Sequence, residues 1–454
     1  MNARTQDTQT LISLAARNLP RYTSYPTAPH FKPLAAEDYE AWLGAIPPGL
    51  DHSLYLHVPY CRSLCWYCGC HMKVENRYER LRPYVTAMKR ELALLRERLL
   101  ERPRLTHLHW GGGTPSILSG EDFAAIMGSV RDAFEVAPGA ELAIEIDPRQ
   151  LSDDLVEALG ATGINRASFG VQDFSPRVQE AIHRVQSPEL VAGALRRLRT
   201  AGVSGINFDL MYGLPYQGEA ELRRTVELAV AMEPDRLAVF GYAHVPWMKK
   251  HQRLIPEAAL PGETERLAQA ELAAELLKAA GYLPIGLDHF ARPGDPMAEA
   301  WREGRLRRNF QGYTTDSADL LLPIGASAIG FLPQGFVQNE PDIGGYIKTL
   351  EAGRLPCRRG LPVSREDKLR QAVIERVMSA RQVDVAALCR EWGFPEDFLD
   401  ASLGKTAELE AAGLLTRQGR KLSISGEARR FLRHIAAAFD AYLAESQTRH
   451  SRAV

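Results

Sequence analysis

The sequence predicts an α/β protein whose main unit is an incomplete barrel of six βα units, followed by a smaller, mostly helical C-terminal unit. Short β-branched and apolar runs alternate with longer amphipathic stretches between Ser53 and Ala243, which is typical of βα units around a parallel sheet. Polar residues recur where these runs end. The pattern changes after residue 244 and again near residue 361, and 454 residues exceed one average domain.

The six expected strands are separated by stretches with apolar residues at helical spacing, as crossover helices require. The carboxyl ends of parallel strands meet at one mouth of a barrel. We therefore expect the polar residues that end these runs to share a cavity, among them Glu145, Gln172 and Asp209. The strands are expected at residues 54–58, 106–110, 141–146, 166–171, 205–212 and 236–243.

Beyond residue 244 the sequence predicts a helix at 263–280, a strand at 282–290 and a Gly- and Asn-rich region at 309–339. Helices at 364–380 and 383–393 and a hairpin with a following helix within 413–432 then resemble a winged-helix unit. Without a strongly basic recognition face, we expect this unit to pack or to cover rather than to bind DNA. The expected segments are an N-terminal extension at 1–45, the partial barrel at 46–290, a barrel extension at 291–360 and the C-terminal unit at 361–454.

The composition narrows the class of protein. A net charge of −1 provides no basic field for nucleic acid or anionic lipid. The longest uncharged stretch, 320–339, is broken by prolines and glycines and does not predict a membrane span. The N-terminus lacks the pattern of a signal peptide. We therefore expect a cytoplasmic protein that binds neither nucleic acid nor a membrane.

Four of the six cysteines lie within ten residues, at Cys61, Cys65, Cys68 and Cys70. In a reducing compartment such a cluster indicates metal binding or redox chemistry rather than disulfides. Cys61, Cys65 and Cys68 follow the first expected strand, and thiolates are suitable ligands for iron–sulfur clusters. Three cysteines for four irons would leave one iron open to a small molecule. A cramped zinc site is the alternative; the isolated Cys357 and Cys389 are interpreted as buried small hydrophobic residues.

The Cys-x3-Cys-x2-Cys spacing in this position resembles the radical S-adenosylmethionine superfamily. The resemblance implies a TIM-like partial barrel of the radical SAM type. It also implies a 4Fe-4S cluster on Cys61, Cys65 and Cys68, with S-adenosyl-L-methionine bound to the open iron and cleaved to a 5′-deoxyadenosyl radical. The glycine-rich segment 111–115 matches the superfamily segment that contacts the methionyl amino group, and Glu145 resembles the acid that holds the cofactor. Because glycines lack side chains, we interpret this segment as backbone that approaches a ligand closely.

Further motifs narrow the resemblance to the oxygen-independent coproporphyrinogen III oxidases, or coproporphyrinogen dehydrogenases. These motifs span nearly the whole chain: RYTSYPT, HVPYCRSLCWYCGC, LHWGGGTP, EIDPR, GVQDF, FDLMYGLP, GYAHVP, GLDHFARP and RRNFQGYTT. The related haem chaperones, which bind and deliver haem, are the alternative, but they tend to lack RYTSYPT and the Cys-x-Cys ending supplied here by Cys68 and Cys70. A nucleic-acid-modifying radical enzyme would need an accessory basic domain that the sequence lacks.

This resemblance implies a reaction in haem biosynthesis: the ring A and ring B propionates of coproporphyrinogen III become vinyls, giving protoporphyrinogen IX. An unidentified electron donor and acceptor are implied, and we expect a monomer. Residues that match the site of the cluster-bound S-adenosylmethionine are Tyr55, Gly112, Glu145, Ala243 and Ile329. A second S-adenosylmethionine site, or simply substrate contacts, is matched by Tyr67, Gly113, Thr114, Gln172, Arg184 and Asp209, where Tyr67 replaces a frequent Phe.

The substrate carries four carboxylates, which call for guanidinium or imidazole donors. The candidates in the narrow motifs are Arg21, His289, Arg292 and Arg308. No protein base is strictly required for hydrogen abstraction by the radical, so no residue is predicted to be catalytic with certainty. Cys70 is not expected to bind the cluster, and it either acts at the substrate side or only packs there.

Overall fold

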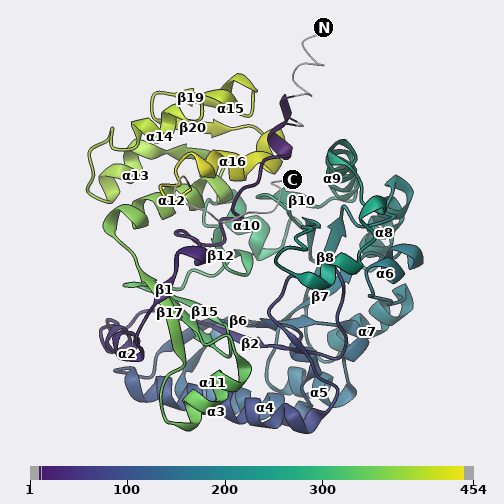
Figure 1. Cartoon of the computed structure of the whole chain (residues 1–454), viewed down its shortest axis with the longest axis vertical. Helices are drawn as coiled ribbons and strands as arrows, with labels where there is room; N and C mark the ends of the chain where they lie inside the picture. The colour runs from purple at the N-terminus through teal and green to yellow at the C-terminus, as the bar shows by residue number, and fades with distance from the viewer. Residues whose placement is uncertain (1–9, 12, 444–454) are drawn as a thin grey trace.

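The centre of the molecule is one large mixed sheet, seen in the computed structural model, which describes residues 10–11 and 13–443 (Figure 1). Six neighbouring strands run parallel in chain order and confirm the six that the sequence predicts. They are β2 (His52–Val58), β5 (Arg104–Gly112), β6 (Glu135–Ile146), β7 (Arg166–Gln172), β8 (Gly205–Tyr212) and β9 (Arg236–Gly241).

The strands alternate between residues that face the helices and residues that face the inside of the barrel, because successive side chains of a strand point to opposite faces. In β8, Ile206, Phe208 and Leu210 are fully buried in the hydrophobic core. Asn207 and Asp209 alternate with them and line a hollow inside the barrel. The sequence pattern GINFDLMY therefore places a carboxylate in the interior of the barrel while it builds the core.

Helices between the strands cover the outer face of the barrel, along the bottom and right of Figure 1. The helices are α3 (Arg82–Arg98), α4 (Gly120–Ala133), α5 (Asp153–Ala161), α6 (Pro176–Ala181), α7 (Pro188–Thr200), α8 (Glu219–Ala231) and α9 (Glu263–Ala279). Serine side chains cap the N-termini of two of these helices. The Ser119 hydroxyl accepts a hydrogen bond from the Asp122 amide in α4, and the Ser187 hydroxyl accepts one from the Leu190 amide in α7.

The sheet does not close into a ring among the described strands, since β1 and β10 stand at its two ends. β14 (Leu320–Ile324) pairs in parallel with β2, and antiparallel strands continue from it: β15 (Ile329–Leu332), β16 (Gly335–Asn339), β17 (Cys357–Pro362) and β1 (Lys32–Pro33). The antiparallel β11 (His289–Ala291) and β10 (Leu283–Ile285) follow β9. The predicted incomplete barrel is thus confirmed.

Two expectations about this region need correction. The single strand predicted at 282–290 is wrong, because residues 283–291 form the antiparallel pair β10 and β11. Gly286 turns the chain with a φ of +49°, and a Cβ there would lie 2.0 Å from the Tyr313 ring, so glycine is required. β6 begins at Glu135 rather than at 141, and its pairing with β5 shifts register within this added part.

The C-terminal unit lies at the top left of Figure 1 and contains the predicted helices and hairpin. Its core also holds Leu14, Tyr22 and Tyr25 of the N-terminal segment. The division into four segments therefore stays a prediction. The unit comprises α12 (Arg365–Ser379), α13 (Val385–Glu391), α14 (Asp400–Gly404), α15 (Ala407–Ala411), α16 (Leu432–Ala437), β18 (Gln382–Asp384), β19 (Leu415–Gln418) and β20 (Lys421–Ile424).

Shorter elements complete the chain between these parts. Within residues 10–11 and 13–443, none of the helices combines the length and the apolar character that crossing a membrane requires. The remaining α-helices and strands are α2 (Ala36–Gly44), α10 (Pro296–Arg302), α11 (Ile343–Glu351), β3 (Tyr60–Cys61), β4 (Lys73–Val74), β12 (Arg307–Asn309) and β13 (Gly312–Thr314).

Candidate active site

The loop after β2 carries the three predicted cluster cysteines at the carboxyl end of the parallel strands. Cys61 ends β3, Cys65 is buried, and Cys68 is partly exposed. Backbone contacts hold the loop: the Glu75 amide donates to the Cys61 carbonyl at 2.9 Å, and the Cys68 amide donates to the Cys65 carbonyl at 3.1 Å. These main-chain contacts help to order the loop, together with side chains of the segment 249–252 that contact its carbonyl groups.

The three thiols suit a cluster by their chemistry. Burial, together with the negative charge of Cys68, raises the pKa of the Cys61 thiol, so a cationic group is needed to stabilise its thiolate. In the described part of the chain, no three His, Cys, Asp or Glu side chains converge on a point for one metal ion. A cubane does not require such convergence, because each thiolate binds a different iron. The residues therefore fit a 4Fe-4S cluster with one iron left open.

Cys70 contacts Cys68, one of the three predicted cluster ligands. Its amide donates to the Cys68 sulfur at 3.4 Å. A hydrogen bond between the Cys70 and Cys68 side chains lowers the pKa of Cys68 to about 6, against the opposing effect of burial. Lys249 holds the Cys70 carbonyl at 2.9 Å. The role of Cys70 stays a prediction.

The glycine-rich segment packs against the cysteine loop itself. A Cβ at Gly112, where φ is +123°, would lie 2.7 Å from the Val58 carbonyl oxygen, and one at Gly113 would lie 2.7 Å from that of Tyr60. The Gly113 and Thr114 amides donate to these same two carbonyls at 2.9 Å. These glycines therefore let two segments of the protein pair closely, and their expected approach to a ligand stays a prediction.

Three of the five residues matched to the first cofactor site lie on adjacent strands, at Tyr55, Gly112 and Glu145. Tyr55 is half-buried and its hydroxyl lies 3.0 Å from His57 Nδ1. Glu145 Oε1 lies 3.2 Å from His109 Nε2, and its side chain is 41% exposed, so it remains open to a ligand. The other two lie apart on the chain: Ala243 follows β9, and Ile329 begins β15.

The second set is the group of residues matched to a second S-adenosylmethionine site. Of these, Arg184 contacts the cysteine loop directly. Arg184 is buried, and its guanidinium donates to the Gly170 carbonyl, Asp147 and the Cys65 sulfur. Asp209 accepts from Ser168 at 3.0 Å and from Asn207 at 2.9 Å. Burial first and the charge of Glu145 second raise the pKa of Asp209 to about 6. Of the others, Gln172 has a φ of +68° at the end of β7, Thr114 is buried against Ser116, and Tyr67 is half-buried.

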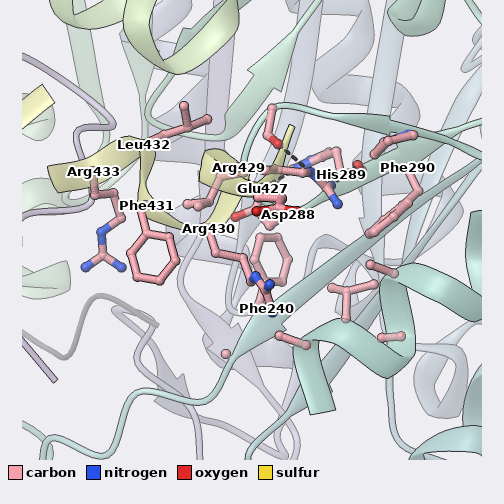
Figure 2. Close-up of a pocket in the computed structure, with 18 of the residues that line it drawn as sticks. Phe240, Asp288, His289, Phe290, Glu427, Arg429, Arg430, Phe431, Leu432 and Arg433 are labelled. Carbon is pink, nitrogen blue, oxygen red and sulfur yellow. Dashed lines mark hydrogen bonds and ion pairs between the residues drawn. The ribbon is translucent and has the colours of Figure 1, made fainter. Parts of the chain in front are cut away.

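A cavity of about 1070 Å³ lies between the barrel and the C-terminal unit (Figure 2). It contains three of the four predicted substrate residues, Arg21, His289 and Arg308. The fourth, Arg292, is not part of its lining; its side chain is 43% exposed and pairs with Glu233 at 3.6 Å. The structure therefore brings three of these candidates together and separates the fourth.

Arg429 and Arg433 also line this cavity, and neither is among the residues that the sequence predicts for the site. Arg429 lies in the 3-10 helix Glu427–Phe431 with its guanidinium 4.1 Å from the centre of the Phe290 ring, and Arg433 lies in α16. Their spacing of four residues within the mostly apolar stretch ARRFLRHIA was the available signal, because residues at i and i+4 share one face of a helix.

The cavity holds an excess of positive charge. Arg21, Arg308, Arg429 and Arg433 all interact electrostatically with one carboxylate, Asp288. Burial is the main cause that lowers the pKa of both Arg429 and Arg433 to about 10, and the charges of Arg21 and Arg308 contribute to the lowering at Arg433. Burial alone would raise the pKa of Asp288, but His289, Arg308 and Arg429 hold it at about 2.

A guanidinium nitrogen of Arg308 is available to an anionic ligand in this cavity. Arg308 Nη1 is buried and has no hydrogen bond to any residue that the structure describes, although Arg308 Nε donates to the Tyr22 carbonyl at 3.3 Å. Asp288 is engaged by His289 at 2.7 Å. A buried donor without an acceptor is costly. The cavity is therefore built to receive anionic groups.

A smaller hollow of about 250 Å³ inside the barrel adjoins this cavity, since Phe240, His289 and Gln311 line both. Glu145 and Asp209 line the smaller hollow. The carboxyl ends of the barrel strands and the arginine-rich cavity therefore form one continuous site, with cofactor candidates on one side and anion-binding side chains on the other.

Comparisons with known proteins agree with this geometry. Residues 55–229 match the family model of the Radical SAM superfamily. The chain is 49% identical over 444 residues to the oxygen-independent coproporphyrinogen III oxidase of Bradyrhizobium diazoefficiens, covering 98% of this chain and 99% of that relative. It is 43% identical to the protein of that name from Paracoccus denitrificans, over 95% of this chain and 96% of the relative.

A solved structure matches as well. The coproporphyrinogen III oxidase of Escherichia coli, described as a radical SAM enzyme, superposes with a TM-score of 0.89 at 34% identity, covering 94% of this chain and all of that one. The fold and the cysteine loop define a radical SAM enzyme that uses a 4Fe-4S cluster and S-adenosyl-L-methionine. The zinc alternative is thereby set aside. Within that class, the chain belongs to the family of oxygen-independent coproporphyrinogen III oxidases.

Proposed function

We propose that this chain oxidatively decarboxylates the ring A and ring B propionates of coproporphyrinogen III to vinyls, giving protoporphyrinogen IX without oxygen. The observation that carries the proposal is the arginine-rich cavity that adjoins the hollow lined by Glu145 and Asp209, because a substrate with four carboxylates needs several guanidinium donors in one place. The names of the relatives support the same substrate.

The residues of the site would have two tasks: to hold the cluster and its cofactor, and to bind the substrate. When bound to the cluster, S-adenosyl-L-methionine supplies the 5′-deoxyadenosyl radical that takes a hydrogen atom from a propionate β-carbon. Cys61, Cys65 and Cys68 would hold the cluster, and Tyr55 and Glu145 would hold the cofactor. The cavity side chains would bind the propionates that do not react and so fix which propionate faces the radical.

Several side chains suit this second task. Arg21, Arg308, Arg429 and Arg433 would bind carboxylates, while Asp288 orients His289 through the 2.7 Å contact to its Nδ1. The set Tyr67, Gly113, Thr114, Gln172, Arg184 and Asp209 would hold a second S-adenosylmethionine or the reacting end of the substrate.

Each vinyl formed requires loss of one hydrogen atom, release of carbon dioxide and transfer of one electron to an acceptor. We propose that a separate electron donor reduces the cluster and that a separate acceptor takes this electron. The protein would work as a cytoplasmic monomer, away from nucleic acid and membranes. The haem-chaperone alternative is not kept, because relatives of up to 49% identity are named as oxidases.

The test is an anaerobic assay of the reconstituted holoenzyme with a reductant, S-adenosylmethionine and coproporphyrinogen III. We expect protoporphyrinogen IX, carbon dioxide and 5′-deoxyadenosine. A parallel titration with haem tests the chaperone alternative. Stoichiometric haem binding without any vinyl product would contradict the proposal.

A further inference from the structure

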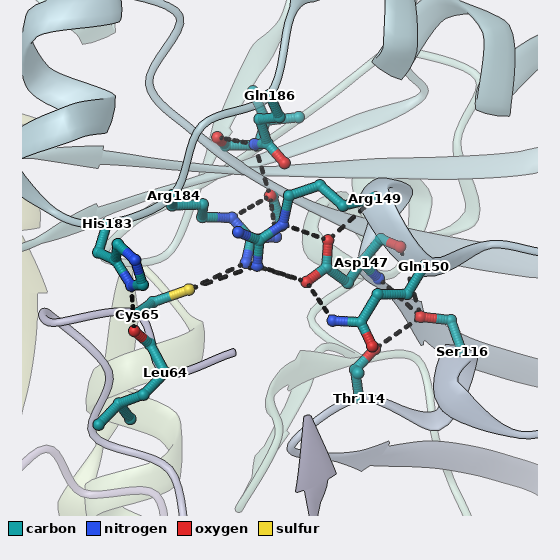
Figure 3. A network of polar contacts seen from close by, with 12 residues as sticks. Leu64, Cys65, Thr114, Ser116, Asp147, Arg149, Gln150, His183, Arg184 and Gln186 are labelled. Carbon is teal, nitrogen blue, oxygen red and sulfur yellow. Dashed lines mark hydrogen bonds and ion pairs between the residues drawn. The ribbon is translucent and has the colours of Figure 1, made fainter. Parts of the chain in front are cut away.

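Two arginines contact the sulfur of Cys65, and Figure 3 shows both guanidinium groups on the same side of it. Arg149 Nη2 and Arg184 Nη1 each donate to this sulfur at 3.5 Å. The Cys68 sulfur instead accepts the Cys70 amide. Arg149, Arg184 and Cys65 are all largely buried, with side-chain exposures of 18% and 8% for the two arginines.

Asp147 holds the two guanidiniums in place. Arg149 Nε and Nη2 grip its two oxygens at 2.9 and 2.7 Å, and Arg184 Nη1 lies 3.4 Å from Asp147 Oδ2. Burial would raise the pKa of Asp147, but Arg184 and Arg149 hold it at about 2, so the carboxylate is charged. Two positive charges and one negative charge therefore lie beside one sulfur, with a net charge of +1.

The backbone fixes Arg184 from the other side. Its Nε and Nη2 donate to the Gly170 carbonyl at 3.1 and 2.6 Å. A Cβ at Gly170 would lie 2.8 Å from Arg184 Nη2, so glycine leaves the room that the guanidinium occupies. All three guanidinium nitrogens of Arg184 are thus engaged by the protein.

We infer that Arg149 and Arg184 are positioning residues that set the reduction potential of the cluster through the Cys65 sulfur. The inference rests on the proposed assignment of Cys65 as a cluster ligand. A one-electron reduction makes the cluster more negative, and hydrogen bonds to sulfur and nearby net charge are the features that tune such potentials. In a buried setting this charge is weakly screened, so the arginines favour the reduced state.

The test is a redox titration of the reconstituted holoenzyme, followed by the electron paramagnetic resonance signal of the reduced cluster, without coproporphyrinogen. For Arg149→Gln, we expect the ratio of reduced to oxidised cluster at a fixed potential to fall about tenfold, which is ~59 mV toward more negative potential for one electron. Arg149→Lys keeps the positive charge but loses the two-pronged contact of the guanidinium with Asp147, so the shift of the midpoint potential should be smaller than for Arg149→Gln. Arg223→Gln on the exposed side of α8 is the matched control and should leave the potential unchanged.

The outcomes separate this role from mere packing. An unchanged midpoint in Arg149→Gln with full iron content would overturn the inference. If Arg149→Gln takes up no cluster, Arg149→Lys decides: a loaded variant with a shifted potential supports the role, and a loaded variant with the wild-type potential overturns it. Because no substrate is present, failure of the proposed decarboxylation would not affect this readout.

Discussion

The two sides of the site are assembled in different ways. The cluster side comes mainly from short, continuous pieces of chain: the cysteine loop, the glycine segment at the end of β5 and the end of β6 with the residues that follow it. The cavity side gathers Arg21, His289, Arg308, Arg429 and Arg433 from segments far apart in the sequence. The difference shows that backbone geometry defines the cluster side, whereas long-range packing of the C-terminal unit defines the anion-binding side.

The largest expected effect is loss of the cluster, from a substitution that changes only the cluster side. Cys65→Ser should lose the cluster and all activity, because a serine hydroxyl is a poor replacement for a soft thiolate. Iron content and visible absorption after anaerobic reconstitution measure this. Cys357→Ser, at the half-buried cysteine of β17, is the control and should bind a full cluster. Cys70→Ser should also keep it. A fully loaded Cys65→Ser protein would contradict the ligand assignment.

The cavity side should respond in the opposite way. Arg429→Gln and Arg433→Gln should each raise KM for coproporphyrinogen by about 10- to 100-fold, since each removes a charge-assisted hydrogen bond to a carboxylate. The iron content should stay at the wild-type level. Steady-state kinetics over a range of substrate concentrations provides the measurement.

Arg292→Gln is the matched control for these arginines, because its side chain pairs with Glu233 outside the cavity. Its KM should change by less than about twofold, as exposed ion pairs contribute little. Equal effects of Arg292→Gln and Arg429→Gln on KM would show that the cavity does not select the substrate by position.

A glycine substitution tests whether backbone geometry defines the cluster side. Gly112→Ala should lower the free energy of unfolding of the apoprotein by about 1–3 kcal/mol, because the residue has a φ of +123° and the Cβ would meet the Val58 carbonyl. Urea unfolding and iron uptake measure the effect. Gly69→Ala, in the cysteine loop that the Gly112 segment packs against, has open space around its Cβ and should behave like the wild type. Equal stability of the two variants would refute the close pairing of these loops.

The smallest expected effect concerns Asp209, between the two sides. Its folded pKa of about 6 lies above the ordinary 3.8, so it favours the folded state at low pH, and this contribution is lost as pH rises through about 6. Asp209→Asn should therefore gain about 1–3 kcal/mol of unfolding free energy over the wild type between pH 4 and pH 8. Unfolding of the apoproteins at both pH values measures this gain.

Glu145→Gln checks the cause of that shift. The Glu145 charge helps to raise the pKa of Asp209, so its removal should reduce the pH dependence of stability between pH 4 and pH 8. A difference between wild type and Asp209→Asn that does not vary with pH would mean that Asp209 is not held protonated.

Local patterns predicted much of the fold. The six parallel strands follow from runs of apolar residues, and the C-terminal helices follow from helical spacing. The single strand predicted at 282–290 is wrong because Gly286 lies within an apolar run, whereas its positive φ and the nearby Tyr313 ring make it a turn. An isolated glycine within such a run indicates a bend, and only the packing of Tyr313 shows how sharp it is.

By itself, the sequence determined the cysteine loop and the parallel strands of the barrel, because these depend on neighbouring residues and on their spacing, and its family resemblance implied the class of cofactor. Only the tertiary structure decided which arginines meet. Arg292 and Arg308 both lie in narrow family motifs, yet one pairs on the surface and the other lines the cavity. Arg149 likewise became a partner of Cys65 only through folding. Charge has no periodicity that shows its partner, so long-range packing must bring such groups together.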